Sequence, residues 1–281
     1  MTPAIANPPA TQVADGPAKD HYFDYRSAQI RYRDVGIGPP VVLVHGWTLD
    51  LEMWDVQAAQ LQRAFRVVRY DRRGFGRSFG QPSAAQDCED LVALCDHLAL
   101  GCVALVGMSQ GVRPVLQLAA SAPKRVACLV LDGPPDLEAA AEEVDLSRYR
   151  ALARAQGVDA FRREWARHPL MQLRASDPSV HQSLQAILER YPGIDLTDRS
   201  LGRGATATLF QPDSVLTPAL VISGEYDIAS RVQAADRLAT RLPHGERAII
   251  PGAGHLANFD NPCRYTQITA AFLARHAIAP S

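Results

Sequence analysis

The feature that most constrains this chain is a Gly-x-Ser-x-Gly motif, Gly107 to Gly111, placed between an apolar run and a helical pattern. Residues 103–106 predict a buried strand, and residues 115–120 predict a helix. A serine held between a strand and a helix by two glycines is a nucleophile elbow. The turn is so tight that the two glycines approach each other, and side chains there would clash. We therefore expect the Ser109 hydroxyl above the sheet edge, facing the N-terminus of the following helix.

The chain on both sides of this motif alternates apolar runs with helical patterns. Runs with strand character lie at residues 22–27, 29–34, 41–44, 65–71, 103–106, 126–131, 220–223 and 247–250. Helical patterns lie at residues 52–63, 87–98, 115–120, 231–242 and 262–276. The first two runs suit an antiparallel hairpin, and the later, continuously apolar runs suit strands buried on both faces. This predicts an α/β fold with a mostly parallel eight-stranded sheet and helices on both faces.

The alternation breaks between residues 136 and 213. This stretch has helical patterns at residues 146–167 and 178–190 but no apolar run typical of a buried strand. We expect residues 136–213 to be a helical cap inserted into a core formed by residues 21–135 and 214–281. Residues 1–20 are rich in proline and alanine, and we expect a disordered N-terminal tail there.

Composition excludes several classes of function. The formal net charge is −1 and the pI is about 6.7, which argues against a nucleic-acid partner. No apolar run is long enough to span a membrane, and the N-terminus lacks the basic and apolar segments of a signal peptide. The five cysteines show no metal-ligand spacing and suit free thiols in a reducing compartment. We therefore expect a cytoplasmic protein; the oligomeric state is not predicted.

A serine nucleophile needs a base to take its proton and a carboxylate to orient that base. In a chain with a nucleophile elbow, the acid and then the histidine follow the serine. Asp227 and His255 each follow a predicted strand in this order, so both lie at the same sheet edge as Ser109. Asp132 is an alternative acid, since it ends the strand after the one that carries the nucleophile.

Together these motifs resemble the α/β-hydrolase superfamily, in its esterase-like branch with a helical cap. The matching stretches are His45-Gly46-Trp47, residues 71–78, Gly107–Gly111, Gly224–Asp227 and Gly252–His255, which together span most of residues 22–276. The resemblance implies a Ser109–His255–Asp227 triad, with Asp132 retained as an alternative because some members take their acid from that position. It also implies an oxyanion hole formed by the backbone N–H groups of Trp47 and Gln110. No cofactor or metal is implied.

The residues of the substrate pocket are less defined by the sequence. We consider Trp165, Pro134 and Leu256 as possible pocket residues, although a core role for Trp165 is equally compatible with the sequence. Arg113 and Pro114 depart from the small residues that usually follow the elbow in this superfamily. Proline is tolerated only in the first turn of a helix, so Pro114 limits where the helix begins. Arg113 points either to solvent or to an acidic partner behind the nucleophile.

These residues predict a serine hydrolase that cleaves a small, largely apolar carboxylic ester or lactone through an acyl-enzyme. Three alternatives stay open at this point. The same fold supports cofactor-free dioxygenases of N-heteroaromatic substrates, in which the histidine deprotonates the substrate. Perhydrolase or haloperoxidase activity is also compatible with the triad, and so is a non-catalytic ligand receptor. Dehalogenase and epoxide-hydrolase chemistry requires an aspartate nucleophile, which Ser109 disfavours.

Overall fold

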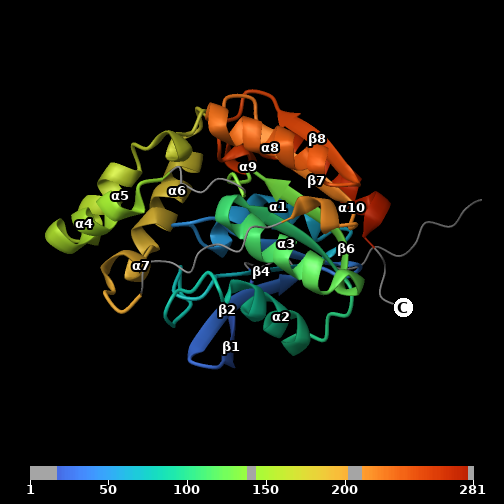
Figure 1. Cartoon of the computed structure of the whole chain (residues 1–281), viewed down its shortest axis with the longest axis horizontal. Helices are drawn as coiled ribbons and strands as arrows, with labels where there is room; N and C mark the ends of the chain where they lie inside the picture. Colours follow the sequence, from blue (N-terminus) through green and yellow to red (C-terminus); the bar gives the residue numbers. More distant parts are fainter. Residues whose placement is uncertain (1–17, 138–143, 202–210, 278–281) are drawn as a thin grey trace, which may run out of the picture.

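The computed structural model describes residues 18–137, 144–201 and 211–277. Its eight strands form one sheet in the order β1-β2-β4-β3-β5-β6-β7-β8 (Figure 1). The strands are β1 (His21–Tyr25), β2 (Ala28–Val35), β3 (Pro40–Val44), β4 (Arg66–Tyr70), β5 (Val103–Met108), β6 (Val126–Asp132), β7 (Ala219–Gly224) and β8 (Gly245–Ile250). β2 pairs antiparallel with both β1 and β4, and every pair from β4 to β8 is parallel. The predicted mostly parallel, eight-stranded sheet is confirmed.

Helices cover both faces of the sheet because alternate residues of each strand point to opposite faces. Val42 and Val44 of β3 belong to the apolar cluster under α2 (Asp87–His97), α3 (Val112–Ser121) and α8 (Ala229–Arg241). Val41 and Leu43 belong to the cluster under α1 (Asp55–Leu61) and α10 (Pro262–His276). A short helix, α9 (Ala257–Asp260), precedes α10. The resulting layers agree with the predicted α/β architecture.

In the described part of the chain between β6 and β7, four α-helices are grouped together at one side of the sheet (Figure 1). They are α4 (Leu146–Gln156), α5 (Val158–Trp165), α6 (Pro178–Arg190) and α7 (Ile194–Thr197). The prediction of one helix over residues 146–167 is wrong, because the chain breaks at Gly157 with φ 86° and ψ 164°. Glycine adopts this conformation readily, whereas a side chain would be strained there. The expected cap and tail stay predictions, and residues 138–143, 202–210 and 1–17 of them lie outside the described residues.

Parallel strands bring the loops that follow them to one edge of the sheet. Ser109 directly follows β5, Asp227 follows β7, and His255 follows β8. β5, β6, β7 and β8 are consecutive neighbours in the sheet, so these loops lie side by side. The topology therefore gathers the three residues that the sequence analysis singled out.

Candidate active site

The turn at Ser109 has the conformation of a nucleophile elbow. A 3-10 turn, Ser109–Gly111, joins β5 to α3, and Ser109 has a φ of +52°. Such a φ is strained for a residue with a side chain and is typical of functional sites. A Cβ atom on Gly107 would lie 2.4 Å from the carbonyl oxygen of Gly111, and one on Gly111 would lie 2.6 Å from that of Val44. Both glycines are therefore needed for the turn.

His255 and Asp227 form a buried pair beside this turn. The His255 Nδ1 and the Asp227 Oδ2 lie 2.9 Å apart, and both side chains are at most 4% exposed. The other carboxylate oxygen of Asp227 accepts the backbone N–H of Ile228 at 2.8 Å. A Cβ on Gly133 would lie 2.8 Å from His255 Cε1, so this glycine makes room for the imidazole ring. A carboxylate on Nδ1 fixes the ring and leaves Nε2 as the proton acceptor.

Asp132, the alternative acid, lies in a different environment. It is completely buried beside the Tyr265 hydroxyl, and no hydrogen bond of good geometry reaches either of its oxygens among the described residues. Burial raises its pKa well above the usual value for a carboxyl group, and the neighbouring charge of Asp227 adds to that shift. The structure therefore brings Asp227 to His255, whereas Asp132 makes no hydrogen bond to this ring in the part of the chain described.

The loop after β3 packs directly against the elbow. A Cβ on Gly46 would lie 2.8 Å from the Met108 sulfur and 3.2 Å from the Ser109 Cβ. This close approach places the next residue, Trp47, on the wall of the same cavity as Ser109 and Gln110. The two predicted backbone donors, Trp47 and Gln110, thus flank Ser109 on neighbouring segments.

His45 holds this loop in place and is a neutral side chain. Its Nε2 accepts the backbone N–H of Arg72 at 2.8 Å, so its Nδ1 carries the proton and donates to the carbonyl of Gly46 at 2.7 Å. Burial, together with the nearby Arg72 charge, lowers the pKa of His45 to about 3. A ring with both nitrogens engaged in this way positions the loop and is unsuited to proton transfer.

The helices between β6 and β7 bond to the same loop through two indoles. Trp47 donates its Nε1–H to Asp195 of α7 at 2.7 Å, and Trp165 of α5 donates its Nε1–H to the Thr48 hydroxyl at 2.8 Å. The two indole rings meet edge to face, with centroids 4.8 Å apart. α5 and α7 are therefore fixed to the segment that carries the Trp47 backbone.

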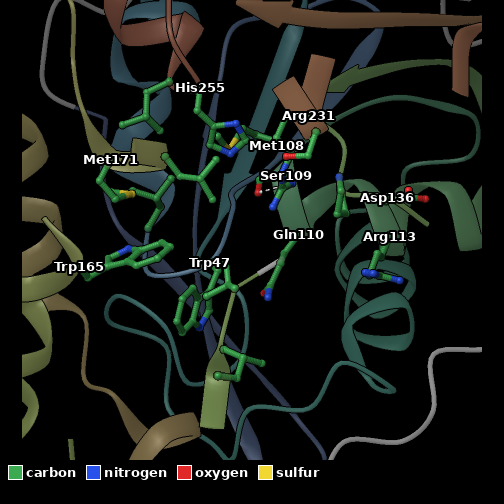
Figure 2. A pocket seen from close by; sticks show the side chains of 17 residues that line it. Trp47, Met108, Ser109, Gln110, Arg113, Asp136, Trp165, Met171, Arg231 and His255 are labelled. Carbon is green, nitrogen blue, oxygen red and sulfur yellow. Dashed lines mark hydrogen bonds between the residues drawn. The ribbon is translucent and has the colours of Figure 1, made fainter. Parts of the chain in front are cut away.

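A cavity of about 360 Å³ lies above Ser109 (Figure 2). It is lined by Trp47, Leu49, Met108, Ser109, Gln110, Arg113, Pro135, Asp136, Val144, Leu146, Trp165, Leu170, Met171, Ser230, Arg231, His255 and Leu256. The predicted pocket residues Trp165 and Leu256 are among them. Pro134, which is buried in the turn after β6, is not among them, whereas its neighbour Pro135 lines the cavity. Arg113 lines the cavity and also interacts with another group of the protein, and our expectation of an acidic partner for it stays a prediction.

The sequence analysis missed several lining residues, and among them Arg231 has a hydrogen-bonding contact with the Ser109 hydroxyl. It lies in the first turn of α8 and is only 5% exposed. Its guanidinium NH1 lies 3.4 Å from the Ser109 Oγ and 3.1 Å from the carbonyl oxygen of Gly133. Its position in the sequence could have indicated this role, because it lies four residues after Asp227, at the start of the helix that follows the Asp227 loop.

Two further findings concern metal binding and membrane-spanning helices among the described residues. No group of three or more histidine, cysteine, aspartate or glutamate side chains among them could hold a metal ion. None of the helices that the structure describes has both the length and the apolar character needed to cross a membrane.

Comparison with known proteins places this geometry in context. A model of the α/β-hydrolase fold matches residues 39–262. A protein of Synechocystis sp. named "Putative non-heme chloroperoxidase" is 31% identical over 274 residues, which cover 87% of this chain and 94% of that protein. A thermophilic esterase from Thermogutta terrifontis has a TM-score of 0.78 at 26% identity, covering 93% of this chain and all of that one. The enol-lactonase from Burkholderia xenovorans LB400 shares the fold, with a TM-score of 0.79 at 24% identity, covering 90% of this chain and all of its own.

Proposed function

Because the chain belongs to the α/β-hydrolase fold family, we propose that it is a serine hydrolase of small carboxylic esters or lactones. The observation that carries this proposal is the buried His255–Asp227 pair, 2.9 Å apart, on the wall of the cavity that also exposes Ser109. A carboxylate-oriented imidazole beside a serine on a strained turn is the arrangement that activates a hydroxyl group.

The proposed reaction begins when His255 Nε2 takes the Ser109 proton and the Ser109 Oγ attacks the substrate carbonyl. The backbone N–H groups of Trp47 and Gln110 donate to the oxyanion, each stabilising the transition state by roughly 3 kcal/mol. The alcohol leaves with the proton from His255, and an acyl-enzyme remains on Ser109. Water, deprotonated by His255, attacks the acyl group and releases the acid.

The size and lining of the cavity support a small substrate with an apolar portion. A volume of about 360 Å³ is at the lower end of small-molecule sites. Trp165, Leu170 and Met171 give one wall an apolar surface, and in our proposal residues 136–213 form the cap that supplies it. Esters and lactones present the same acyl carbonyl to Ser109, so both classes suit this mechanism.

A second candidate function is perhydrolysis, favoured by the relative named as a chloroperoxidase. In that reaction hydrogen peroxide, in place of water, attacks the acyl group on Ser109. The products are a peracid and the free serine, and the peracid then oxidises halide in solution. Peroxide-dependent bromination that requires a carboxylic acid and is lost in Ser109→Ala would support this activity.

The primary test replaces Ser109 and labels it. We expect Ser109→Ala to lose at least about 1,000-fold of the kcat for p-nitrophenyl acetate, because the nucleophile is gone. A fluorophosphonate probe should label the wild-type chain at Ser109, as shown by peptide mass spectrometry. Ser121→Ala, an exposed serine at the end of the helix that follows the elbow, is the matched control. Wild-type turnover in Ser109→Ala, or labelling at another residue, would contradict the proposal.

A further inference from the structure

We infer that the substrate carries a carboxylate group besides the bond that is cleaved, and that Arg231 binds this carboxylate. The inference rests on the proposed function, because it concerns the molecule that Ser109 attacks. It changes the expected substrate from an apolar ester to one with an apolar part and an acidic part.

The first observation is the position of Arg231. Its guanidinium lies 3.4 Å from the Ser109 Oγ, so a molecule bound to this serine must pass next to it. Its hydrogen bond to the carbonyl of Gly133, 3.1 Å long, anchors the group at the turn after β6. The side chain is 5% exposed and lines the cavity. The guanidinium group is a cation, so a positive charge lies beside the proposed nucleophile.

The second observation is the charge of the cavity wall. Among the described lining residues, Arg113 and Arg231 are the cations and Asp136 is the one carboxylate. Asp136 also forms an ion pair of 2.6 Å with Arg237, which does not line this cavity. Both lining arginines also interact with other groups of the protein. An apolar ester gains nothing from two guanidinium groups, whereas a carboxylate can take two parallel hydrogen bonds from one of them.

The third observation is that the apolar and the charged side chains of the cavity wall lie on opposite sides of Ser109. Figure 2 shows Trp165 and Met171 on one side of Ser109, with Arg113 and Asp136 on the other and Arg231 above the serine hydroxyl. A substrate with its carbonyl at Ser109 would therefore extend its apolar part towards Trp165 and its acidic part towards Arg113 and Arg231. This geometry suits a half-ester of a short dicarboxylic acid, or a lactone that bears a carboxylate.

The test compares two esters that differ at one end only. Monomethyl glutarate ends in a carboxylate where methyl pentanoate ends in a methyl group, and release of acid from both can be followed in a pH-stat. We expect the ratio of kcat/KM for the charged over the neutral ester to fall about 10- to 100-fold in Arg231→Gln, chiefly through KM. Arg231→Lys should recover part of the ratio, because lysine keeps the positive charge but lacks the paired N–H donors of a guanidinium group.

The matched control is Arg241→Gln. Arg241 lies on the same helix as Arg231 and pairs with Asp213 outside this cavity, so the ratio should equal that of the wild type. An unchanged ratio in Arg231→Gln would overturn the inference. If Ser109→Ala abolishes hydrolysis of both esters while Arg231→Gln keeps the ratio, the carboxylate site fails and the proposed function stands. If Ser109→Ala still hydrolyses both, the proposed function itself fails.

A second measurement needs no variant and covers the case in which Arg231→Gln does not fold. Glutarate is butyrate with a second carboxylate, and both can be tested as inhibitors of p-nitrophenyl acetate hydrolysis by the wild-type enzyme. We expect glutarate to bind at least about 10-fold more tightly than butyrate, because its second carboxylate reaches the arginine. Equal inhibition by the two acids would overturn the inference.

Discussion

The indole N–H of Trp47 donates a hydrogen bond of 2.7 Å to the carboxylate of Asp195 on helix α7. The hydroxyl of Tyr191, itself 1% exposed, donates to the other carboxylate oxygen at 2.5 Å. One aspartate thus accepts from two donors that come from different parts of the chain. Through it, helix α7 fixes the loop that supplies the proposed oxyanion donor of Trp47.

Asp195→Ala should therefore destabilise the protein and slow the reaction. The substitution leaves the Trp47 and Tyr191 donors without an acceptor, which costs about 2–4 kcal/mol of the free energy of unfolding. We expect this loss in urea denaturation, together with a fall in kcat. Asp159→Ala is a control, since Asp159 is an exposed residue of α5 that pairs only with Arg162 at 2.6 Å among the described residues. Equal stability of the two variants would contradict a bridging role for Asp195.

A pair of isosteric substitutions separates the two candidate acids. Asp227→Asn should lower kcat by about 1,000- to 10,000-fold, because the amide no longer holds His255 in the required tautomer. Asp132→Asn should leave kcat within about 3-fold, since burial raises the Asp132 pKa well above its usual value and a neutral amide then replaces a neutral acid. Steady-state kinetics on p-nitrophenyl acetate decide the matter. The reverse pattern would make Asp132 the acid.

The elbow itself is tested at Gly107. In Gly107→Ala the new methyl group would meet the Gly111 carbonyl oxygen at 2.4 Å, and backbone atoms on both sides of Ser109 would have to move. We expect a clear fall in melting temperature and loss of fluorophosphonate labelling. Gly101→Ala adds the same methyl group where no atom lies within 4 Å, so it should keep both properties. A Gly107→Ala protein with wild-type labelling would show that the turn tolerates a side chain.

The buried His45 makes a prediction about pH and stability. Its pKa in the folded chain is about 3, against 6.5 for an ordinary histidine, so between these values the unfolded chain binds a proton that the folded chain does not. Stability from this group is therefore complete above pH 6.5 and is lost as the pH falls. From pH 6.5 to 5.5 the loss is about 1 kcal/mol. The difference in free energy of unfolding between the wild type and His45→Gln should therefore fall by about 1 kcal/mol between these pH values, as measured by urea denaturation. A difference that stays constant would contradict the prediction.

Much of the fold could be predicted because the strands are continuously apolar and end in polar loops. The eight strands lie within about two residues of the predicted ranges. The places of Ser109, Asp227 and His255 directly after predicted strands assigned all three to one sheet edge. Apolar periodicity failed at Gly157, since the pattern continues across a glycine whose backbone leaves the helix.

The features that escaped prediction depend on side-chain direction. Arg231 lies on a helix whose start was predicted correctly to within about two residues, yet periodicity does not say whether an arginine in a first turn faces solvent or the nucleophile. Arg113 likewise lies in the first turn of its helix, α3, and lines the cavity. Pro134 and Pro135 differ by one residue in chain position and point to different surroundings. Such choices are made by the packing of distant segments.

The positive φ of Ser109 destabilises the folded chain at the same residue that carries the proposed nucleophile. Any residue with a Cβ atom at this position inherits the same backbone strain, and only glycine escapes it. Glycine has no hydroxyl, so the substitution that relaxes the turn is also one that ends the proposed reaction. Selection for stability therefore favours glycine at position 109, whereas selection for the proposed activity favours serine. A library screened for thermal resistance alone would be expected to drift away from serine here.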